Sequence, residues 1–262
     1  MAAEPPKLSA VIIAFNDEPN MRACLESVCW ADEIIVVDSF STDATEKISR
    51  EFTDRVYQEK FSGFGALRNA AMQYASYDWI LSVDTDERVT SDARTEIQTL
   101  LQHGPEANAY FVPRRNVFLG QWIRHCGWYP DYRQPQLFRK QAMRYREDLV
   151  HEGFDVDGTL GYLKNAIEQY PFRDLDHFFQ KMNRYSSLMA NRLDQEGRRF
   201  HPHQLFTHTG FTFLKMYGLR LGCLDGAVGF ILSILYAYYT FLKYAKLWEL
   251  QKSHATITNS PH

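Results

Sequence analysis

The sequence predicts an α/β fold in which a mostly parallel sheet is covered by helices on both faces. Two observations support this prediction. Short apolar runs alternate with segments of helical spacing over the first hundred residues. Polar residues follow these runs at the points where the strands would end. With 262 residues, 45% of them hydrophobic, the chain can form one large domain or one domain with an appendage.

The first hundred residues supply four strands and four helices. Residues 8–14, 33–38 and 79–84 are nearly continuous apolar runs, as expected of buried parallel strands, and residues 56–57 predict a shorter strand. The intervening segments have the capping residues and apolar spacing of helices. We predict these helices at residues 19–28, 44–52, 65–74 and 91–101.

The pattern changes after residue 105. From residue 109 to 152 the apolar runs are short and broken by prolines, which favours antiparallel strands and loops. Helical spacing returns at residues 175–193. We therefore divide the chain into an α/β half at 1–105 that binds the first substrate, an acceptor-binding and catalytic region of the same domain at 106–200, and a C-terminal helical segment at 201–262.

The C-terminal segment contains a long apolar stretch, residues 226–242, without a charge. As a helix this stretch would be about 25 Å long, short of the roughly 30 Å hydrocarbon core of a bilayer. Basic residues and a tryptophan flank it and three tyrosines lie within it, which is typical of the membrane interface. The stretch predicts membrane association. The alternative is a buried terminal helix or a homodimer contact. Membrane association and such packing can also occur together.

Charge and cysteine usage exclude several classes of protein. A net charge of −3 and a pI near 6.3 provide no basic stripe of the kind that binds nucleic acid. The four cysteines form no Cys-x-x-Cys pair, so neither a zinc site nor a disulfide framework is indicated. The first seven residues lack the basic and apolar regions of a signal peptide. A cytoplasmic protein with reduced thiols is therefore expected.

Two aspartates, Asp84 and Asp86, end the apolar run 79–84. Residues two apart in a strand project to the same side, so both carboxylates can approach one cation. Paired hard oxygen ligands suit Mg²⁺ or Mn²⁺ that bridges a diphosphate. A solvated turn without a ligand is the alternative.

The ends of the other strands are polar as well. Asn16, Asp17 and Glu18 follow the first strand, and Asp38 ends the second. Ligands of open parallel sheets bind beyond the carboxyl ends of the strands, so these residues predict a nucleotide held by hydrogen bonds and, through a metal, by its phosphates. No Gly-x-Gly-x-x-Gly follows the first strand, which argues against a dinucleotide. Asp38 either accepts from a base or ribose, or caps the following helix.

Several segments carry a family resemblance. Residues 9–18, residues 34–43 and the aspartate pair together resemble the inverting family 2 glycosyltransferases, which implies their Rossmann-like GT-A fold. Three further segments are similar to the branch of lipopolysaccharide-core β-glucosyltransferases of the WaaE type. They are residues 63–69, Val150-His151-Glu152 and Lys181-Met182-Asn183-Arg184-Tyr185.

The resemblance implies a UDP-sugar site in the α/β half. The residues that would line the nucleotide pocket are Ala14, Asn16, Glu18 and Asp38. Arg68 would lie near the diphosphate, the alternative being a cation on the helix surface. Asp84 would support ribose and metal, and Asp86 would be the direct ligand of Mg²⁺ or Mn²⁺. A metal there neutralises the charge that develops on the departing nucleoside diphosphate.

An inverting transfer also needs a base on the face of the sugar opposite the leaving group. The resemblance assigns this role to Glu152, with Asp148 and Asp131 as alternatives, and His151 would orient the base or the acceptor. An exposed acidic residue without a catalytic role is the competing interpretation of Glu152.

Lys181, Arg184 and Tyr185 form a further motif. Their spacing resembles the Gln-x-x-Arg-Trp element of processive family members, with Lys and Tyr in place of Gln and Trp. We interpret the three residues as a clamp for the diphosphate or the acceptor, and the replacements argue against processive polymer synthesis.

The sequence therefore predicts a metal-dependent, inverting transfer of a hexose, with glucose expected, from a UDP-sugar. The expected acceptor is a membrane-associated glycan or lipid such as the lipopolysaccharide inner core, at the inner face of the cytoplasmic membrane. One alternative is a haloacid-dehalogenase-like phosphatase with Asp84 as nucleophile and Asp86 as acid, but such enzymes carry this motif on their first strand. The other is a non-catalytic scaffold that binds nucleotide-sugar or membrane.

Overall fold

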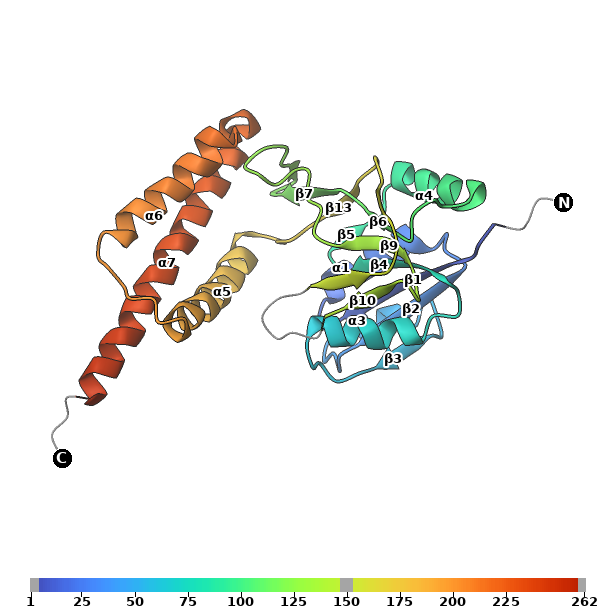
Figure 1. Cartoon of the computed structure of the whole chain (residues 1–262), viewed down its shortest axis with the longest axis horizontal. Helices are drawn as coiled ribbons and strands as arrows, with labels where there is room; N and C mark the ends of the chain where they lie inside the picture. Colours follow the sequence, from blue (N-terminus) through green and yellow to red (C-terminus); the bar gives the residue numbers. More distant parts are fainter. Residues whose placement is uncertain (1–4, 147–152, 259–262) are drawn as a thin grey trace. The chain divides into compact units, whose positions relative to one another are not determined.

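The computed structural model describes the backbone of residues 5–146 and 153–258. The chain divides into two compact units (Figure 1). The first comprises Met1–Arg115 and Pro130–Gln169, and the second comprises Asn116–Tyr129 and Tyr170–His262. Each unit therefore contains segments that are distant in the sequence.

A seven-stranded sheet forms the first unit, in the order β12-β6-β9-β4-β1-β2-β3. Four neighbouring strands of this sheet are parallel, with β3 at the edge: β1 (Leu8–Ala14), β2 (Glu33–Asp38), β3 (Val56–Gln58) and β4 (Trp79–Asp84). β1 pairs with β2 on one side and with β4 on the other, both in parallel. The strands predicted at 8–14, 33–38 and 79–84 are confirmed with these bounds.

Four helices accompany these strands: α1 (Glu18–Val28), α2 (Thr45–Ser49), α3 (Phe64–Gln73) and α4 (Ser91–His103). The hydroxyl of Thr90 caps α4 by accepting from the backbone N–H of Ala93. α2 is shorter than the predicted 44–52. Beyond Ser49 the backbone forms turns, in which Glu51 donates to Ile48 and Phe52 donates to Ser49.

The core of the first unit lies on both faces of the sheet. Ala10 and Ile12 of β1 face one hydrophobic cluster, which includes the apolar side of α1. Val11, between them, faces a second cluster that includes Leu67 and Ala71 of α3. Alternate residues of one strand are thus buried on opposite faces, which explains why the strand is apolar at nearly every position. Helices cover both faces, as predicted.

The remaining strands are short and partly antiparallel. They are β5 (Glu87–Arg88), β6 (Ala109–Phe111), β7 (Arg114–Phe118), β8 (Gln121–Trp122), β9 (Pro135–Arg139), β10 (Met143–Tyr145), β11 (Phe154–Val156), β12 (Leu160–Tyr162) and β13 (Ile167–Gln169). β9 lies antiparallel between β4 and β6, and β10 pairs antiparallel with β11. The mixed pattern predicted after residue 105 is confirmed.

The second unit is mainly helical. Its helices are α5 (Leu175–Gln195), α6 (Gln204–Phe213), the π-helical η1 (Leu214–Leu219), the 3₁₀-helical η2 (Gly222–Asp225) and α7 (Gly226–Thr258). Phe178 and Met182 of α5 pack with Leu232 and Leu235 of α7 in one hydrophobic cluster.

The predicted division of the chain at residue 200 differs from these units. α5 was assigned to the region 106–200, but its buried residues recur every four positions and pack against α7. The segment 116–129 also belongs to the second unit. These contacts depend on which helix face meets which partner, and residue order alone does not reveal that.

α7 extends well beyond the predicted apolar stretch 226–242. Among the described residues, one helical segment, Gly222–Ser253, is long and apolar enough to cross a membrane, judged by length and composition alone. Only 39% of its most apolar window is buried within the protein. Most of this surface is therefore left uncovered by the rest of the described chain.

Candidate active site

The parallel register brings the predicted strand-end residues to one edge of the sheet. Ala14 of β1 is opposite Asp38 of β2, and Ile13 of β1 is opposite Asp84 of β4. The two aspartates therefore flank the carboxyl end of β1. This is the edge at which ligands bind in open parallel sheets.

The loops that follow β1 and β2 are tied together by hydrogen bonds. The side-chain oxygen of Asn16 accepts from the backbone N–H of Thr42 at 2.7 Å, and the backbone N–H of Asn16 donates to the Ser41 hydroxyl at 2.8 Å. A carboxylate oxygen of Glu18 accepts from the backbone N–H of Ala44 at 3.2 Å. Asn16 has a φ of 47°, in the left-handed region that asparagine tolerates better than most residues. Asn16 and Glu18 are exposed beside Asp38 and shape one loop surface.

Asp38 is fully buried and organises the loop that follows it. Its carboxylate accepts from both the backbone N–H and the hydroxyl of Ser41. It does not cap the next helix, because α2 begins at Thr45 and Ala44 is its N-cap residue. The capping alternative is therefore wrong for α2, although Asp38 performs a similar task in the turn before it.

Arg68 of α3 is directed at Asp84. Its guanidinium donates to the Asp84 carboxylate at 2.5 Å and to the Ser82 hydroxyl at 3.1 Å. Arg68 is only 7% exposed, so the alternative of a surface cation is wrong. Burial alone would raise the pKa of Asp84, but Arg68, with a further contribution from Arg114, holds this pKa below its ordinary value. Asp84 is therefore ionised and fixed in place.

A buried ion pair, Glu87 with Arg114, contacts the backbone of Asp84. Glu87 and Arg114 are joined at 2.5 Å with almost no exposed side-chain surface, and Gln136 donates to Glu87 at 2.7 Å. Glu87 also accepts from the backbone N–H of Asp84 at 2.9 Å. Burial raises the pKa of Glu87 despite the opposing effect of Arg114. Glu87 is not among the residues predicted for the site, although its position directly after Asp86 is a signal in the sequence.

Asp86 is half-buried and weakly engaged by the neighbouring amide. The side-chain nitrogen of Gln169 lies 3.4 Å from both carboxylate oxygens, which is long for a hydrogen bond. The amide oxygen of Gln169 is buried and has no hydrogen-bond partner within the described chain. Carboxylate and amide oxygens are ligands that suit Mg²⁺ and Mn²⁺.

These residues suit a cation that binds a ligand as well as the protein. They do not suit a cation that is coordinated by protein side chains alone. The described parts of the chain contain no group of three or more His, Cys, Asp or Glu side chains that could hold a metal ion. Mg²⁺ commonly takes one or two carboxylates and completes its shell with phosphates and water. Asp86, with Asp84 beside it, matches that pattern.

Of the residues predicted for the base, Asp131 lies in the described part of the chain. Glu152, His151 and Asp148 lie outside the described residues. The alternative base, Asp131, forms an ion pair with Arg133 at 2.8 Å. Asp131 belongs to the same unit as the aspartate pair.

Lys181, Arg184 and Tyr185 lie on α5 in the second unit. The ammonium group of Lys181 donates to the backbone carbonyl of Pro171 at 3.2 Å and lies over the ring of Phe172. Arg184 and Tyr185 are exposed. Lys181 therefore steadies the start of α5, and Arg184 and Tyr185 are available for contacts.

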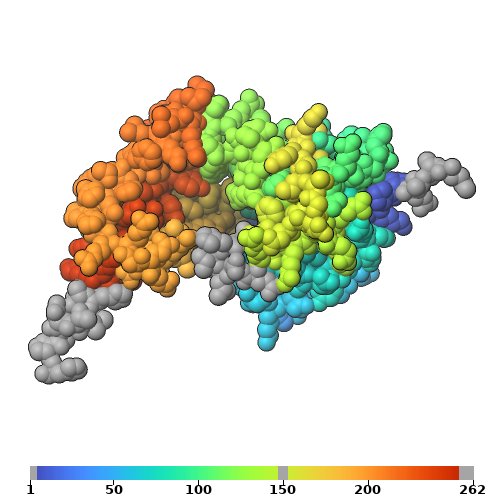
Figure 2. Space-filling model, viewed as in Figure 1, coloured from blue at the N-terminus to red at the C-terminus, as the bar shows by residue number. Residues whose placement is uncertain are grey.

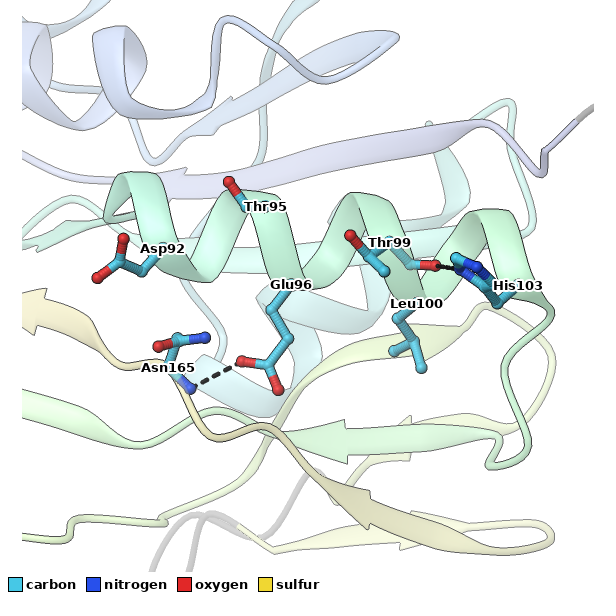
Figure 3. Close-up of a pocket in the computed structure, with 7 residues that line it drawn as sticks. All are labelled: Asp92, Thr95, Glu96, Thr99, Leu100, His103 and Asn165. Carbon is cyan, nitrogen blue, oxygen red and sulfur yellow. Dashed lines mark hydrogen bonds between the residues drawn. The ribbon is translucent and has the colours of Figure 1, made fainter.

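A groove between α4 and Asn165 is lined by residues other than those discussed above. Figure 3 shows its lining, in which Glu96 accepts from the backbone N–H of Asn165 and His103 contacts the Thr99 carbonyl. None of the residues that line this groove was predicted for the site.

The fold and the strand-end site define a glycosyltransferase of the GT-A type. The family model for glycosyl transferase family 2 matches residues 9–171, which is more than half of the chain, and the chain belongs to this family. The phosphatase alternative fails, because the aspartate pair ends the fourth strand rather than the first and the family is a different one.

Relatives match over nearly the whole chain. The chain is 30% identical to the lipopolysaccharide core biosynthesis glycosyltransferase LpsC of Rhizobium meliloti (strain 1021), over 92% of each protein. It is 28% identical to an uncharacterized glycosyltransferase of Rickettsia typhi, over 93% of this chain and 87% of that protein. Among solved structures, residues 1–349 of S. aureus TarS in complex with UDP-GlcNAc share the fold with a TM-score of 0.50 at 17% identity, covering 95% of this chain and 92% of that one.

Proposed function

We propose that this glycosyltransferase is a metal-dependent, inverting hexosyltransferase that uses a UDP-sugar, with glucose as the expected hexose. The observation that carries the proposal is the aspartate pair at the end of β4. Asp84 is fixed by Arg68, and Asp86, two residues further along, is half-buried with the Gln169 amide nitrogen 3.4 Å from its carboxylate oxygens. Two neighbouring carboxylates suit a diphosphate with its cation.

The donor would bind at the carboxyl edge of the sheet. Ala14 and Asp38 lie opposite each other there, and the hydrogen-bonded loops add the exposed Asn16 and Glu18. Because these loops are joined by backbone and side-chain bonds, their polar groups are oriented before a nucleotide arrives. Such preorganisation reduces the entropic cost of binding.

Asp86 is the proposed direct ligand of Mg²⁺ or Mn²⁺, and Asp84 supports ribose and the metal. A bound cation would neutralise the charge on the nucleoside diphosphate as it departs. Arg68 acts as a positioning residue for Asp84, since its guanidinium is buried against that carboxylate. The family resemblance implies that Arg68 also lies near the diphosphate, and this remains part of the proposal.

Glu152 is the proposed base. In an inverting transfer a carboxylate takes the proton of the acceptor hydroxyl while that oxygen attacks the anomeric carbon, and the nucleoside diphosphate leaves on the opposite face. The aspartate pair cannot supply this base, because it serves the leaving group. His151 would orient the base or the acceptor, and Asp148 and Asp131 remain the alternatives.

The proposed acceptor is a membrane-associated glycan of the lipopolysaccharide inner-core type, reached at the inner face of the cytoplasmic membrane. Support comes from LpsC, whose name refers to lipopolysaccharide core biosynthesis and which matches over most of both chains. The uncovered apolar surface of α7 is consistent with work at a membrane. Arg184 and Tyr185 are the proposed acceptor or diphosphate contacts on α5.

Isothermal titration with UDP and Mn²⁺ tests the metal role. Asp86→Ala should abolish the Mn²⁺-dependent part of UDP binding, because the proposed direct ligand is removed. Asp54→Ala is the matched control, since Asp54 is an exposed aspartate of the same unit. Equal Mn²⁺-dependent affinity in Asp86→Ala and the control would contradict the role of Asp86 as a metal ligand.

A panel of UDP-sugars, followed by slow UDP release without an acceptor, identifies the donor. UDP release above background from one sugar would also exclude a catalytically silent scaffold. Absence of release or transfer from every donor, with UDP binding retained, would favour that scaffold.

A further inference from the structure

α6 and α7 form an antiparallel hairpin in the second unit, visible as the orange and red helices in Figure 1. Contacts along it join residues progressively closer in sequence. The rings of His208 and Tyr244 are 4.8 Å apart, the hydroxyls of Thr212 and Thr240 are 3.1 Å apart, and the rings of Tyr217 and Phe230 are 5.5 Å apart. The hairpin turns at residues 219–225, which we call the apex.

The apex exposes three leucines. Leu219, Leu221 and Leu224 are 75%, 50% and 65% exposed. Exposed apolar side chains continue along both helices, and they include Phe206, Phe211, Leu214, Phe230, Ile231, Ile234, Tyr238 and Phe241. Single exposed apolar residues are ordinary, but so many along one hairpin indicate an interaction surface.

The apex is held in place by a buried carboxylate. Asp225 is 4% exposed and accepts from the backbone N–H groups of Arg124 and His125 and from the His125 imidazole, the last two at 2.9 Å. The backbone carbonyl of Arg220 accepts from Cys126. The segment 116–129 thus contacts one side of the apex. In Figure 2 green and orange atoms adjoin there. The leucines are therefore presented by an ordered turn.

The backbone of the apex supports the same conclusion. Leu221 adopts a left-handed φ of 54°, which is uncommon for a residue other than glycine or asparagine. Such a conformation persists only where the surroundings impose it. Here the surroundings keep an apolar side chain in water, at a cost that a partner on this surface would offset.

Charge identifies the kind of partner. Between residues 197 and 248 the chain has six Lys or Arg residues and one acidic residue, Asp225. That acid is buried against His125, so it contributes little to the surface. Arg220 lies in the apex, and Lys215 lies just before it in η1. Apolar side chains bordered by cations and without exposed acids complement anionic lipid headgroups.

We propose that the apex inserts Leu219, Leu221 and Leu224 into the surface of an anionic bilayer, with Lys215 and Arg220 at the headgroups. The inference rests on the proposed membrane-associated acceptor and specifies how the enzyme reaches it. α6 and η1 together have 16 residues, about 24 Å at roughly 1.5 Å per residue, less than the roughly 30 Å hydrocarbon core. The chain enters and returns on one side, so insertion is shallow.

The cysteines of the chain provide the probe. Cys223 is exposed within the apex and Cys29 is exposed in the first unit, while Cys24 and Cys126 are buried. Burial raises the pKa of the Cys24 and Cys126 thiols and so suppresses their labelling. In Cys29→Ser the fluorophore NBD reports on the apex, and in Cys223→Ser it reports on the first unit.

With vesicles of phosphatidylcholine and phosphatidylglycerol, NBD at Cys223 should shift to the blue and brighten, whereas NBD at Cys29 should not. Neutral phosphatidylcholine vesicles or high salt should weaken the response, since headgroup attraction contributes. An unchanged spectrum at Cys223 with both vesicle types would overturn the proposal. So would a response that is equal at the two positions.

Leucine variants test the apex without relying on a label. Leu219→Ser with Leu224→Ser should reduce the fraction that floats with anionic vesicles by about tenfold. Leu160→Ser with Leu188→Ser is the matched control, because these leucines are 45% and 53% exposed elsewhere. Equal flotation of the two double variants would contradict insertion of the apex.

Two further measurements separate the possible failures. UDP titration on the same samples reports on the donor site, so loss of vesicle binding with UDP binding intact would overturn the apex proposal alone. Light scattering without vesicles tests whether a second copy covers the surface. A dimer in which NBD at Cys223 is already shielded would show that this surface binds a second copy of the chain, and it would overturn the bilayer proposal.

Discussion

Asp84 is the residue on which the donor site converges. Its carboxylate is bound by Arg68, and its backbone N–H is bound by Glu87, which in turn pairs with Arg114. Two ion pairs, Arg68–Asp84 and Glu87–Arg114, are thus linked through the backbone N–H of Asp84. Removal of one member would leave a buried charge without its partner, which typically costs about 3–5 kcal/mol. This arrangement holds Asp84 in position before a ligand binds.

The depressed pKa of Asp84 predicts a specific pH dependence. A carboxyl group with a lower pKa in the folded state stabilises the fold above its unfolded pKa, and this contribution is lost as pH falls through the folded pKa. Asp84→Asn lacks the contribution at every pH. The difference in free energy of unfolding between wild type and Asp84→Asn, measured in urea, should therefore shrink as pH falls below the ordinary aspartate pKa of about 4 and towards the lower pKa of the folded state. A constant difference across this range would contradict the ion pair.

The position of Arg68 depends on how α3, the helix that carries it, packs against its neighbours. α3 is fastened to β10 because the Asn69 side chain exchanges hydrogen bonds with the backbone N–H and carbonyl of Tyr145, at 2.9 and 2.8 Å. Gly65 allows the helix to approach closely, since a Cβ there would lie 2.0 Å from the backbone oxygen of Arg146. The close contact directs Arg68 toward Asp84.

Gly65→Ala should therefore destabilise the fold by about 1–3 kcal/mol, because the obstructing atom belongs to the backbone. UDP binding should weaken at the same time, since α3 and Arg68 must move. Gly210→Ala is the control. Gly210 lies in α6 with no heavy atom within 4 Å of the added Cβ, so alanine should be neutral or stabilising by about 0.5–1 kcal/mol. Thermal unfolding compares the two variants, and equal melting temperatures would refute the close contact.

At the scale of the whole molecule, the two units have different relations to the family. The family model ends at residue 171, so α5, α6 and α7 follow the matched range. The strand-end aspartates belong to the first unit, while the motif on α5 and the apex belong to the second. We infer that the first unit serves the donor and that the second serves the acceptor and its membrane.

Turnover by the whole enzyme tests the proposed base. Glu152→Gln should retain UDP-sugar binding and lose transfer by about two orders of magnitude or more, because the amide cannot accept the acceptor proton. Asp131→Asn is the companion variant, since Asp131 is the described alternative. Near-normal transfer by Glu152→Gln together with a large loss in Asp131→Asn would move the base to Asp131.

The central strands and the strand-end residues were predictable from the sequence. Residues 8–14, 33–38 and 79–84 are apolar on both faces because helices cover both faces, and that local signal depends little on the rest of the chain. The bounds of α2 were less predictable, because capping residues such as Ser41 serve a turn organised by Asp38 instead. The ion pair between Glu87 and Arg114, which contacts the backbone of Asp84, was not predicted, since the two residues are 27 positions apart in sequence.

The sequence by itself determined the α/β order of elements, the family and the aspartate pair, because these depend on local pattern and on motifs. Only the tertiary structure decided that Arg68 is a buried partner of Asp84, that α5 packs on α7, and that the apex leucines are held in water by Asp225. Each of these facts is a contact between distant segments. Such contacts follow from which faces pack together, and the pattern of residues along one segment does not specify them.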